Sequence, residues 1–389
     1  MQLIHRERVL RALRHEETDR VPIDFGGGPA TQIQTDAYRR LLAYLGLPSE
    51  PRVVGLQVDE VVTPSEPVLR RFDVDVRGVR IGGQRWPRGQ DAYVDEWGVL
   101  WERAEPASPF INVEGPLQRI DEPTTADLDR IAWPSFDHGP RLAGLRERTE
   151  AIRRETDFAI VLNLPNASFS VSQRVRGFAE LLEDLLLNKA FATGLLERVT
   201  DFNCDLAIAA LGEVGDLVDC VSIGDDLGTQ DQPLVSPALY RSMLKPHHAR
   251  LVDALRRNSS AVVIMHSDGA IRDLLGDLIE CGVQVINPVQ VSTSGMYPVA
   301  LKREFGAHLS FWGGVDTHHV LPRGTPDEVA AEVRRRLADL GQGGGYVLAS
   351  VHNILAEVPP ENIVAMFDTA RMPGRGPSQH PSAVAAPAS

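Results

Sequence analysis

The feature that most constrains the fold is a regular alternation of short apolar segments with helical segments between residues 158 and 350. The apolar segments are four to eight residues long and predict strands, and the segments between them predict amphipathic helices of ten or more residues. The predicted strands are residues 158–163, 217–224, 261–265, 283–286, 309–312 and 346–350. This pattern is typical of a parallel sheet covered by helices. No strand is followed by GxGxxG, and the strands are evenly spread, so we expect a (β/α)₈ TIM barrel rather than a doubly wound sheet.

The remaining segments add to this barrel. Residues 5–15 and 36–45 predict N-terminal helices, with a short strand at 21–25 between them. Short alternating stretches rich in Trp, Tyr, Val and Gly at about 74–115 predict a small antiparallel β-hairpin insertion. Residues 1–371 are expected to form a single domain, and the Pro/Ala/Ser-rich residues 372–389 a disordered tail.

Composition excludes several classes of protein. Three cysteines without a CxxC pair do not fit a disulfide scaffold or a four-thiolate zinc site. A net charge of −13 disfavours binding to nucleic acid or to an anionic membrane. No apolar run reaches the roughly 20 residues needed to span a bilayer, and the N-terminus lacks the apolar core of a signal peptide. We therefore expect a cytoplasmic protein.

Polar residues follow six consecutive predicted strands. In a (β/α)₈ barrel the carboxyl ends of the strands form the active site. The residues at these ends are Asn163, Asp225, Asp226, His266, Asp268, Asn287, Gln290, Asp316, His352 and Asn353. Any one of them, such as Asn163 or Asn287, is equally well explained as a turn residue. Their recurrence, with two histidines among them, predicts a functional site at the barrel mouth.

Three of these residues form a candidate metal site. His266 and Asp268 are two apart, so extended backbone would direct both side chains to the same side. If the barrel brings His352 beside them, two imidazoles and one carboxylate would suit zinc, with iron(II) and manganese(II) as alternatives. Two other interpretations stay open: Asp268 is the N-cap of the following helix, or His352 is a structural histidine.

Other polar and aromatic residues are interpreted without a function. His247 and His248 lie within a predicted helix and are expected to be exposed. The adjacent His318 and His319 are expected at the surface or at a dimer contact, and Trp97 with its neighbours in a local hydrophobic core.

Several segments resemble a known family. Residues 6–22 resemble the N-terminal signature of the uroporphyrinogen decarboxylase superfamily. Motifs at 224–230, 266–269, 287–290, 313–316 and 344–352 are similar to its methyltransferase-like members. The resemblance extends over about residues 5–371 and implies a (β/α)₈ barrel with additional N-terminal elements.

The sequence departs from this family in two places. True uroporphyrinogen decarboxylases have an arginine-rich loop after the first barrel strand, whereas residues 24–37 contain no Arg or Lys. Because charge-assisted pairs supply much of the binding of a polycarboxylate, turnover of uroporphyrinogen is not expected. In the cobalamin:coenzyme M methyltransferases a His-x-Cys motif and a later Cys hold zinc, and His266, Asp268 and His352 correspond to them here. A metal with N and O ligands is a harder Lewis acid and suits an oxygen leaving group.

The resemblance therefore implies a methyltransferase that moves a methyl group from a small O- or N-methylated compound to a corrinoid protein, with a homodimer as a further expectation. Asp226, Asp316 and Asn163 are the candidate catalytic residues; Asp225, Asn287, Gln290 and Asn353 are candidates for substrate binding. One alternative is a lyase that decarboxylates a small acid or a porphyrinogen, with Asp226 or Asp316 and the metal stabilising a carbanion. The other is a non-catalytic tetrapyrrole-binding protein.

Overall fold

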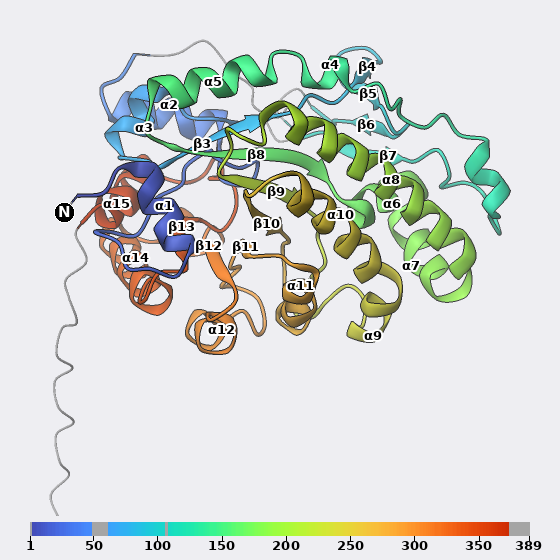
Figure 1. Ribbon diagram of the computed structural model, residues 1–389. Helices are drawn as coiled ribbons and strands as arrows, with labels where there is room; N and C mark the ends of the chain where they lie inside the picture. The colour runs from blue at the N-terminus through green and yellow to red at the C-terminus, as the bar shows by residue number, and fades with distance from the viewer. Residues whose placement is uncertain (1, 49–60, 106–107, 373–389) are drawn as a thin grey trace, which may run out of the picture.

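A curved sheet of seven parallel strands forms the centre of the molecule. The computed structural model describes residues 2–48, 61–105 and 108–372. The sheet order is β13–β12–β11–β10–β9–β8–β3, and neighbouring strands are parallel. The bounds are β3 (Val76–Arg80), β8 (Ala159–Asn166), β9 (Cys220–Gly224), β10 (Val262–His266), β11 (Val285–Asn287), β12 (Ser310–Val315) and β13 (Tyr346–Ser350). Figure 1 shows the helices arranged around the outside of these strands.

A short extended segment at residues 22–24 closes the sheet into a barrel. Ile23 forms a parallel bridge with Leu348 of β13, and the backbone N–H of Leu348 donates to the carbonyl of Pro22 at 2.9 Å. On the other side, the N–H of Asp75, just before β3, donates to the carbonyl of Ile23 at 2.9 Å. Together with the seven strands of the sheet, this segment between β13 and β3 completes a closed barrel of eight strands, so the predicted (β/α)₈ barrel is confirmed.

The barrel helices follow the strands in the predicted alternation. Those that cover the barrel are α2 (Thr35–Tyr44), α3 (Glu66–Arg71), α5 (Leu145–Glu155), α6 (Ser168–Arg176), α7 (Phe178–Leu187), α8 (Lys189–Val214), α10 (Lys245–Asn258), α11 (Leu275–Cys281), α12 (Pro298–Phe305), α14 (Pro326–Leu340) and α15 (Pro360–Ala370). The side chains of Thr325 and Glu328 form a capping box at the start of α14, which fixes where this helix begins.

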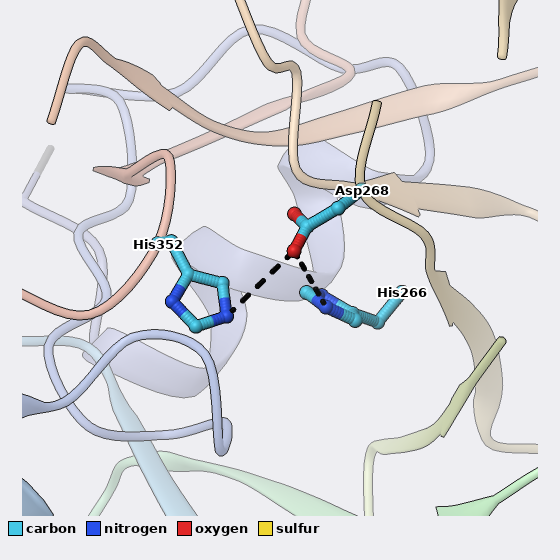
Figure 2. A group of neighbouring side chains, drawn as sticks. All are labelled: His266, Asp268 and His352. Carbon is cyan, nitrogen blue, oxygen red and sulfur yellow. Dashed lines mark ion pairs between the residues drawn. The ribbon is translucent and has the colours of Figure 1, made fainter. Parts of the chain in front are cut away.

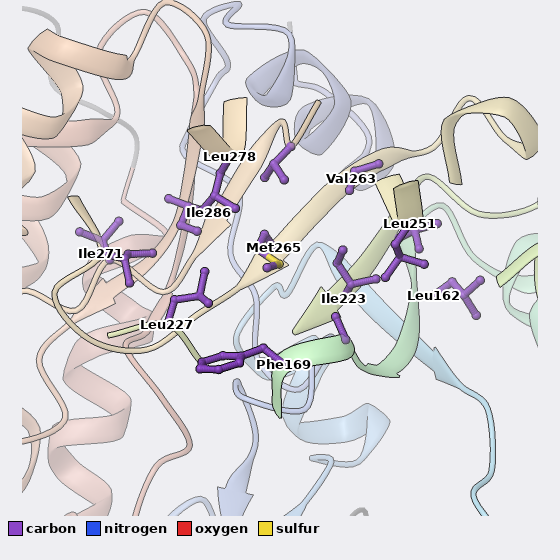
Figure 3. Close-up of a cluster of buried hydrophobic side chains, with 14 of the residues drawn as sticks. Leu162, Phe169, Ile223, Leu227, Leu251, Val263, Met265, Ile271, Leu278 and Ile286 are labelled. Carbon is purple, nitrogen blue, oxygen red and sulfur yellow. The ribbon is translucent and has the colours of Figure 1, made fainter. Parts of the chain in front are cut away.

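Two apolar clusters pack against the two faces of the barrel strands. The larger lies between the strands and the outer helices; Figure 3 shows Ile223, Val263 and Ile286 of the strands among Leu251 of α10 and Leu278 of α11. The smaller lies inside the barrel. It includes side chains from every strand of the sheet and Val9 and Leu13 of α1 (His5–Leu13). Because burial of apolar surface drives folding, both clusters stabilise the arrangement of the strands. The carboxyl ends of these strands form one end of the barrel, here called the mouth.

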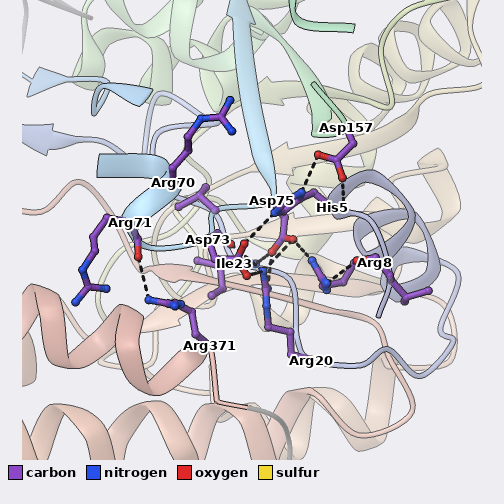
Figure 4. A network of polar contacts seen from close by, with 12 residues as sticks. His5, Arg8, Arg20, Ile23, Arg70, Arg71, Asp73, Asp75, Asp157 and Arg371 are labelled. Carbon is purple, nitrogen blue, oxygen red and sulfur yellow. Dashed lines mark hydrogen bonds and ion pairs between the residues drawn. The ribbon is translucent and has the colours of Figure 1, made fainter. Parts of the chain in front are cut away.

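Charged residues surround α1 at the amino end of the strands. The guanidinium of Arg8 donates to Asp19 and Asp75, and that of Arg20 donates to Asp73 and Asp75 (Figure 4). Both Arg side chains and Asp75 are buried. This network, here called the base network, attaches the N-terminal helix to the bottom of the barrel.

The antiparallel insertion is smaller than the sequence indicates. It consists of β4 (Arg85–Pro87), β5 (Ala92–Asp95), β6 (Leu100–Glu102) and β7 (Ile111–Glu114), paired in chain order. The predicted start near residue 74 is wrong because Val76–Arg80 is a barrel strand that pairs with β8. Its two arginines are typical of an exposed hairpin strand, but Arg77 is buried against the ring of Phe158 and paired with Glu66.

Within the insertion Trp97 and Trp101 are buried, as a local hydrophobic core requires. None of the helices in the described ranges has the length and apolar character to cross a membrane. The tail predicted at 372–389 lies, apart from Met372, outside the described residues.

Candidate functional site

The structure brings His266, Asp268 and His352 together at the carboxyl ends of the strands. His266 ends β10, Asp268 follows it by two residues, and His352 lies two residues beyond β13. One carboxylate oxygen of Asp268 (Oδ2) is 3.9 Å from Nε2 of His266 and 3.8 Å from Nε2 of His352 (Figure 2). One ligand atom from each residue lies within 4.8 Å of the other two. This arrangement is one that can hold a divalent metal ion.

The hydrogen bonds around His266 prepare it for metal binding. Its Nδ1 lies 2.8 Å from Oδ1 of Asn287, an atom that can only accept, so Nδ1 carries the hydrogen. In the neutral ring the lone pair is then on Nε2, which faces Asp268. Such a second hydrogen bond to a metal-binding histidine fixes its tautomer and orientation.

The carboxylate of Asp268 has an unused acceptor. Its Oδ1 is buried and has no hydrogen-bond partner within the described residues. Buried polar atoms are normally hydrogen-bonded, so an atom without a partner calls for an explanation. Two observations thus fit a bound metal ion: the donor atoms are of the types that divalent metals prefer, and a metal ion would give the carboxylate of Asp268 the partner that its Oδ1 lacks.

Asp226 adds a further negative charge beside this site. Its Oδ1 lies 3.8 Å from Nε2 of His266 and accepts the backbone N–H of Asp268 at 3.1 Å. Burial opposes protonation of His266, but the carboxylates of Asp268 and Asp226 and the bond to Asn287 raise its pKa above the ordinary value. The surroundings therefore favour a positive charge at this position.

The structure does not support Asp268 as a helix cap. The next helical turn begins at Arg272, with Ile271 in the N-cap position and no side-chain cap. The backbone N–H of Ala270 donates instead to the carbonyl of Thr229 at 2.8 Å. Ile271 therefore occupies the N-cap position of this turn, and Oδ1 of Asp268 has no hydrogen-bond partner within the described residues.

Three residues predicted to bind substrate have their side-chain oxygens bound to the protein. Asn287 orients His266, as described. Oε1 of Gln290 accepts the N–H of Gly269 at 2.7 Å, and Oδ1 of Asn353 accepts the N–H of Gln32 at 2.8 Å. All three are buried at the mouth. These bonds connect the loops that carry the candidate ligands to neighbouring segments, and substrate binding by these three residues stays a prediction.

Asp225, also predicted to bind substrate, is buried in another network. Its carboxylate accepts the backbone N–H groups of Phe169 at 2.9 Å and Ser170 at 2.6 Å, and it lies 2.8 Å from Nε2 of His248. The other ring nitrogen of His248 is 3.0 Å from the hydroxyl of Tyr240. The carboxylate of Asp225 thus links β9 to α6 and α10, while its backbone N–H donates to the carbonyl of His266 at 2.9 Å.

The expectation that His247 and His248 are exposed is wrong. Both are buried, together with Leu251, Val252 and Leu255 on the same side of α10. This spacing of three to four residues is the apolar face of an amphipathic helix, and it places both histidines on the covered side. The pattern was visible in the sequence and could have identified them.

The candidate catalytic residues Asp316 and Asn163 lie in different surroundings. The carboxylate of Asp316 accepts the backbone N–H groups of His318 at 2.7 Å and His319 at 3.1 Å, so it stabilises the turn before α13 (Val320–Arg323). His318 and His319 are exposed, as expected. Asn163 donates from Nδ2 to the carbonyl of Gly27 at 2.8 Å, while its buried Oδ1 has no partner within the described residues.

A small cavity connects Asn163 with the candidate metal site. Asn163, His266 and Asn287 line it, together with Asp24 and Trp312. The structure thus brings Asn163 and Asp226 near the candidate ligands, and it places Asp225 and Asp316 in structural contacts.

Two arginines near the mouth were missed by the sequence analysis. Arg80 ends β3, in the segment that was assigned to the insertion. Arg174 lies in α6 over the ring of Trp101, 5.5 Å from its centroid. The amide of Asn166, with its oxygen turned toward the guanidinium, accepts from Nη2 of Arg174 at 2.7 Å. A correct assignment of β3 as a barrel strand would have identified Arg80.

Comparisons with known proteins agree with this architecture. A family profile described as "Uroporphyrinogen decarboxylase (URO-D)" matches residues 111–372. A uroporphyrinogen decarboxylase from Neisseria meningitidis is 26% identical over 180 residues, which is 45% of this chain and 48% of that protein. One from Thermus thermophilus is 30% identical over 130 residues, 33% of this chain and 35% of that protein. The matched region therefore spans about half or less of these curated relatives.

A solved structure described as a methyltransferase from Methanosarcina mazei has the same fold. It superposes with a TM-score of 0.67 at 17% sequence identity and covers 95% of this chain and 98% of its own. The profile match includes six of the seven sheet strands and the loops that carry His266, Asp268 and His352. The chain belongs to the uroporphyrinogen decarboxylase (URO-D) family.

Proposed function

We propose that this protein is a metal-dependent methyltransferase that removes a methyl group from a small O- or N-methylated compound and transfers it to a corrinoid protein. The observation that carries the proposal is the cluster of His266, Asp268 and His352 at the mouth of the barrel. The fold shared with a methyltransferase of Methanosarcina mazei supports it. Zinc is the proposed metal, with iron(II) or manganese(II) as alternatives.

His266, Asp268 and His352 would hold the metal. When bound, it would act as a Lewis acid toward the oxygen or nitrogen from which the methyl group departs. The bond between the methyl carbon and this oxygen or nitrogen would break with its electron pair left on the leaving atom, and the corrinoid of the partner protein, in its reduced form, would supply the pair for the new bond to the methyl group.

The residues around this site have separate tasks. Asn287 holds the ring of His266 in the orientation that directs Nε2 to the mouth. Asp226, whose side chain is 48% exposed, can exchange a proton with the leaving group, because one of its oxygens lies beside Nε2 of His266. Asp316 has no part in this proposal, since its carboxylate is bound to the turn that follows β12.

The loop at residues 24–37 argues against uroporphyrinogen as the substrate. In place of a cation, Asp24 lines the cavity, and its carboxylate accepts hydrogen bonds from Nε1 of Trp312 at 2.9 Å and the N–H of Gly27 at 2.8 Å. Burial raises the pKa of Asp24. A substrate with many carboxylates would find no cation from this loop.

A lyase that decarboxylates a small acid is the second candidate. The observation that favours it is the buried guanidinium of Arg80 at the end of β3, which can bind an acid. Release of carbon dioxide from small acids, without any need for a corrinoid, would identify this reaction.

The test combines metal content with methyl transfer. Elemental analysis of the purified protein should find about one divalent metal per chain, and transfer from methoxylated aromatic compounds to a corrinoid protein can be followed by the absorbance of the corrinoid. His352→Gln should lose both metal and activity. The matched control His319→Gln changes an exposed histidine whose Nδ1 lies 3.1 Å from a carboxylate oxygen of Asp316, and it should keep both. Full activity in metal-free protein would contradict the proposal.

A further inference from the structure

The guanidinium of Arg80 is buried without a partner. Neither Nη1 nor Nη2 is accessible to solvent, and neither has a hydrogen-bond partner within the described residues. Burial lowers the pKa of this group to about 10, which still leaves it charged at neutral pH. A buried charge without a counterion is strongly unfavourable. The protein therefore maintains a cation at a place where the fold itself does not neutralise it.

The alternation of side chains along β3 directs Arg80 into the barrel. Val76 belongs to the apolar cluster inside the barrel. A Cβ on Gly78 would lie 2.3 Å from the carbonyl oxygen of Gly27 and 3.1 Å from Nδ2 of Asn163, so position 78 also faces inward. Arg80 is two residues further along and points to the same side, at the carboxyl end of the strand.

The neighbouring Arg77 shows what the outer side of the same strand provides. Its guanidinium is bound to both carboxylate oxygens of Glu66 and lies 3.6 Å from the ring centroid of Phe158. Two arginines three residues apart on one strand thus differ in the partners of their guanidinium groups. The guanidinium of Arg77 is paired with Glu66, and that of Arg80 has no partner among the described residues.

Arg80 lies beside the cavity of the candidate metal site. In the register of β3 and β8, Arg80 pairs with Asn163. Asn163 lines the cavity together with His266, and its Oδ1 is also buried without a partner within the described ranges. Two adjacent strand ends therefore present unused polar atoms on the same side of the mouth.

We propose that Arg80 binds a carboxylate group of the substrate. A carboxylate accepts two parallel N–H bonds from a guanidinium, which would satisfy Nη1 and Nη2 together. The inference rests on the proposed function and specifies its substrate class as a small methylated compound that carries a carboxylate, for example a methoxybenzoate. Arg174 does not take this role, because Asn166 already binds it and the charges of Asp226 and Asp95 face it.

The test measures binding of 4-methoxybenzoate, benzoate, methoxybenzene and inorganic phosphate to the metal-loaded protein by calorimetry. The wild type should bind both carboxylates more tightly than methoxybenzene or phosphate. Arg80→Gln should weaken benzoate binding on the order of ten- to a hundredfold, the effect of losing a hydrogen bond to a charged group. Arg80→Lys should retain part of the affinity, because it keeps the charge but not the two parallel donors. The matched control Arg88→Gln removes the same charge from an exposed position of the insertion and should bind like wild type.

Stability without ligand is the second measurement. Removal of a charge that has no partner should leave the melting temperature of Arg80→Gln unchanged or raised. A clear fall would show that Arg80 is already paired within the protein and would overturn the inference. Equal benzoate affinity in Arg80→Gln and wild type would also overturn it, as would tighter binding of phosphate than of benzoate.

Benzoate separates this inference from the proposed function, because it has no methyl group to transfer. If benzoate binding depends on Arg80 while methoxybenzoate is not demethylated, the binding site is correct and the proposed methyl transfer is wrong. If methoxybenzene is demethylated as fast as methoxybenzoate and benzoate does not bind, the methyl transfer is correct and the carboxylate site is wrong.

Discussion

The two ends of the barrel both collect charged side chains, but they use them in opposite ways. In the base network the carboxylate of Asp75 is bound to Arg8, to Arg20 and to the backbone N–H of Ile23 (Figure 4). At the mouth, Oδ1 of Asp268 and both terminal nitrogens of Arg80 are buried and have no partner within the described residues. The charges of the base network are satisfied by the protein, whereas these three atoms at the mouth are not satisfied by any residue in the described part of the chain.

This difference agrees with the division of labour in (β/α)₈ barrels. The amino end of the strands serves stability, and the carboxyl end carries the active site. A buried polar group without a hydrogen bond destabilises a fold, so each such atom calls for an explanation, and the proposed metal and substrate would supply one for Asp268 and Arg80. The four predictions below test this contrast and are ordered from the largest expected effect to the smallest.

The largest effect is expected for Asp75→Asn in the base network. This change leaves the buried guanidinium groups of Arg8 and Arg20 without their shared counterion, and breaking a buried ion pair in this way costs about 3–5 kcal/mol. Chemical denaturation gives the free energy of unfolding. The control Asp36→Asn removes an exposed ion pair with Arg39 and should cost less than about 1 kcal/mol. A loss at Asp75 as small as that of the control would mean that the base network does not stabilise the fold.

The second effect is expected at the mouth, where Asn287→Ala removes the partner of Nδ1 of His266. Loss of such a bond to a metal-binding histidine weakens metal affinity by about 10- to 100-fold, while the metal ligands themselves remain. Competition with a zinc-binding dye measures the affinity. The control Asn258→Ala changes an exposed asparagine at the end of α10 and should leave it unchanged. Unaltered zinc affinity in Asn287→Ala would separate this histidine from metal binding.

The third effect is the dependence of stability on pH. We expect an acid limit set by Asp19 of the base network and an alkaline limit set by His5, which is hydrogen-bonded to Asp73 of that network. Burial opposes ionisation of Asp19, but hydrogen bonds from Arg8 and from the N–H of Leu3 lower its pKa to about 2. Because the folded pKa is below the unfolded one, this stabilisation is complete above roughly pH 4 and is lost as the pH falls toward 2. Burial also opposes protonation of His5, yet hydrogen bonds to Asp73 and Asp157 raise its pKa. Its stabilisation is complete below about pH 6.5 and is lost as the pH rises through the raised folded pKa.

The free energy of unfolding, measured against pH, should therefore be largest between about pH 4 and 6.5. Asp19→Asn should remove about 1 kcal/mol of the fall on the acid side, since this carboxylate is partly screened by solvent. His5→Gln should remove the fall on the alkaline side. If neither variant changes the shape of the curve, these two groups do not set the limits.

The smallest effect is expected for Asp268→Ala in metal-free protein. Since this carboxylate caps no helix and one of its oxygens has no partner in the described part of the chain, stability should change by less than about 0.5 kcal/mol. A helix cap would instead cost about 0.5–2 kcal/mol. Thermal denaturation with and without zinc distinguishes the two, because the stabilisation by zinc should be lost in the variant. A loss of stability without metal would restore the cap interpretation.

Much of the fold followed from local pattern. The strand at residues 346–350 was predicted with its observed bounds, because its run of apolar residues depends only on neighbouring positions. β3 was missed because two of its five residues are arginines, as in an exposed hairpin, and the contacts of Arg77 with Phe158 and Glu66 come from segments outside its local pattern.

The candidate site was predicted less completely. Asp225, Asp226 and Asp316 all follow barrel strands, and nothing in their local sequence distinguishes them. The structure separates them: Asp225 is bound to α6 and His248, Asp316 to its own turn, and Asp226 lies beside His266. A change of one position along a strand end reverses the direction of a side chain, so the position of a polar residue after a strand does not determine what it contacts.

The sequence by itself determined the barrel and the set of polar residues at its mouth, because hydrophobic periodicity fixes strands and helices and parallel strands place their ends together. It also predicted that His266 and Asp268, two residues apart at a strand end, direct their side chains to the same side. Only the tertiary structure decided which polar atoms remain unused. Their partners come from distant segments, as in the bond between Gln32 and Asn353 across 321 residues of sequence, and a local pattern contains no information about such contacts. The unused atoms of Asp268 and Arg80, which define the proposed site, are therefore a property of the folded molecule.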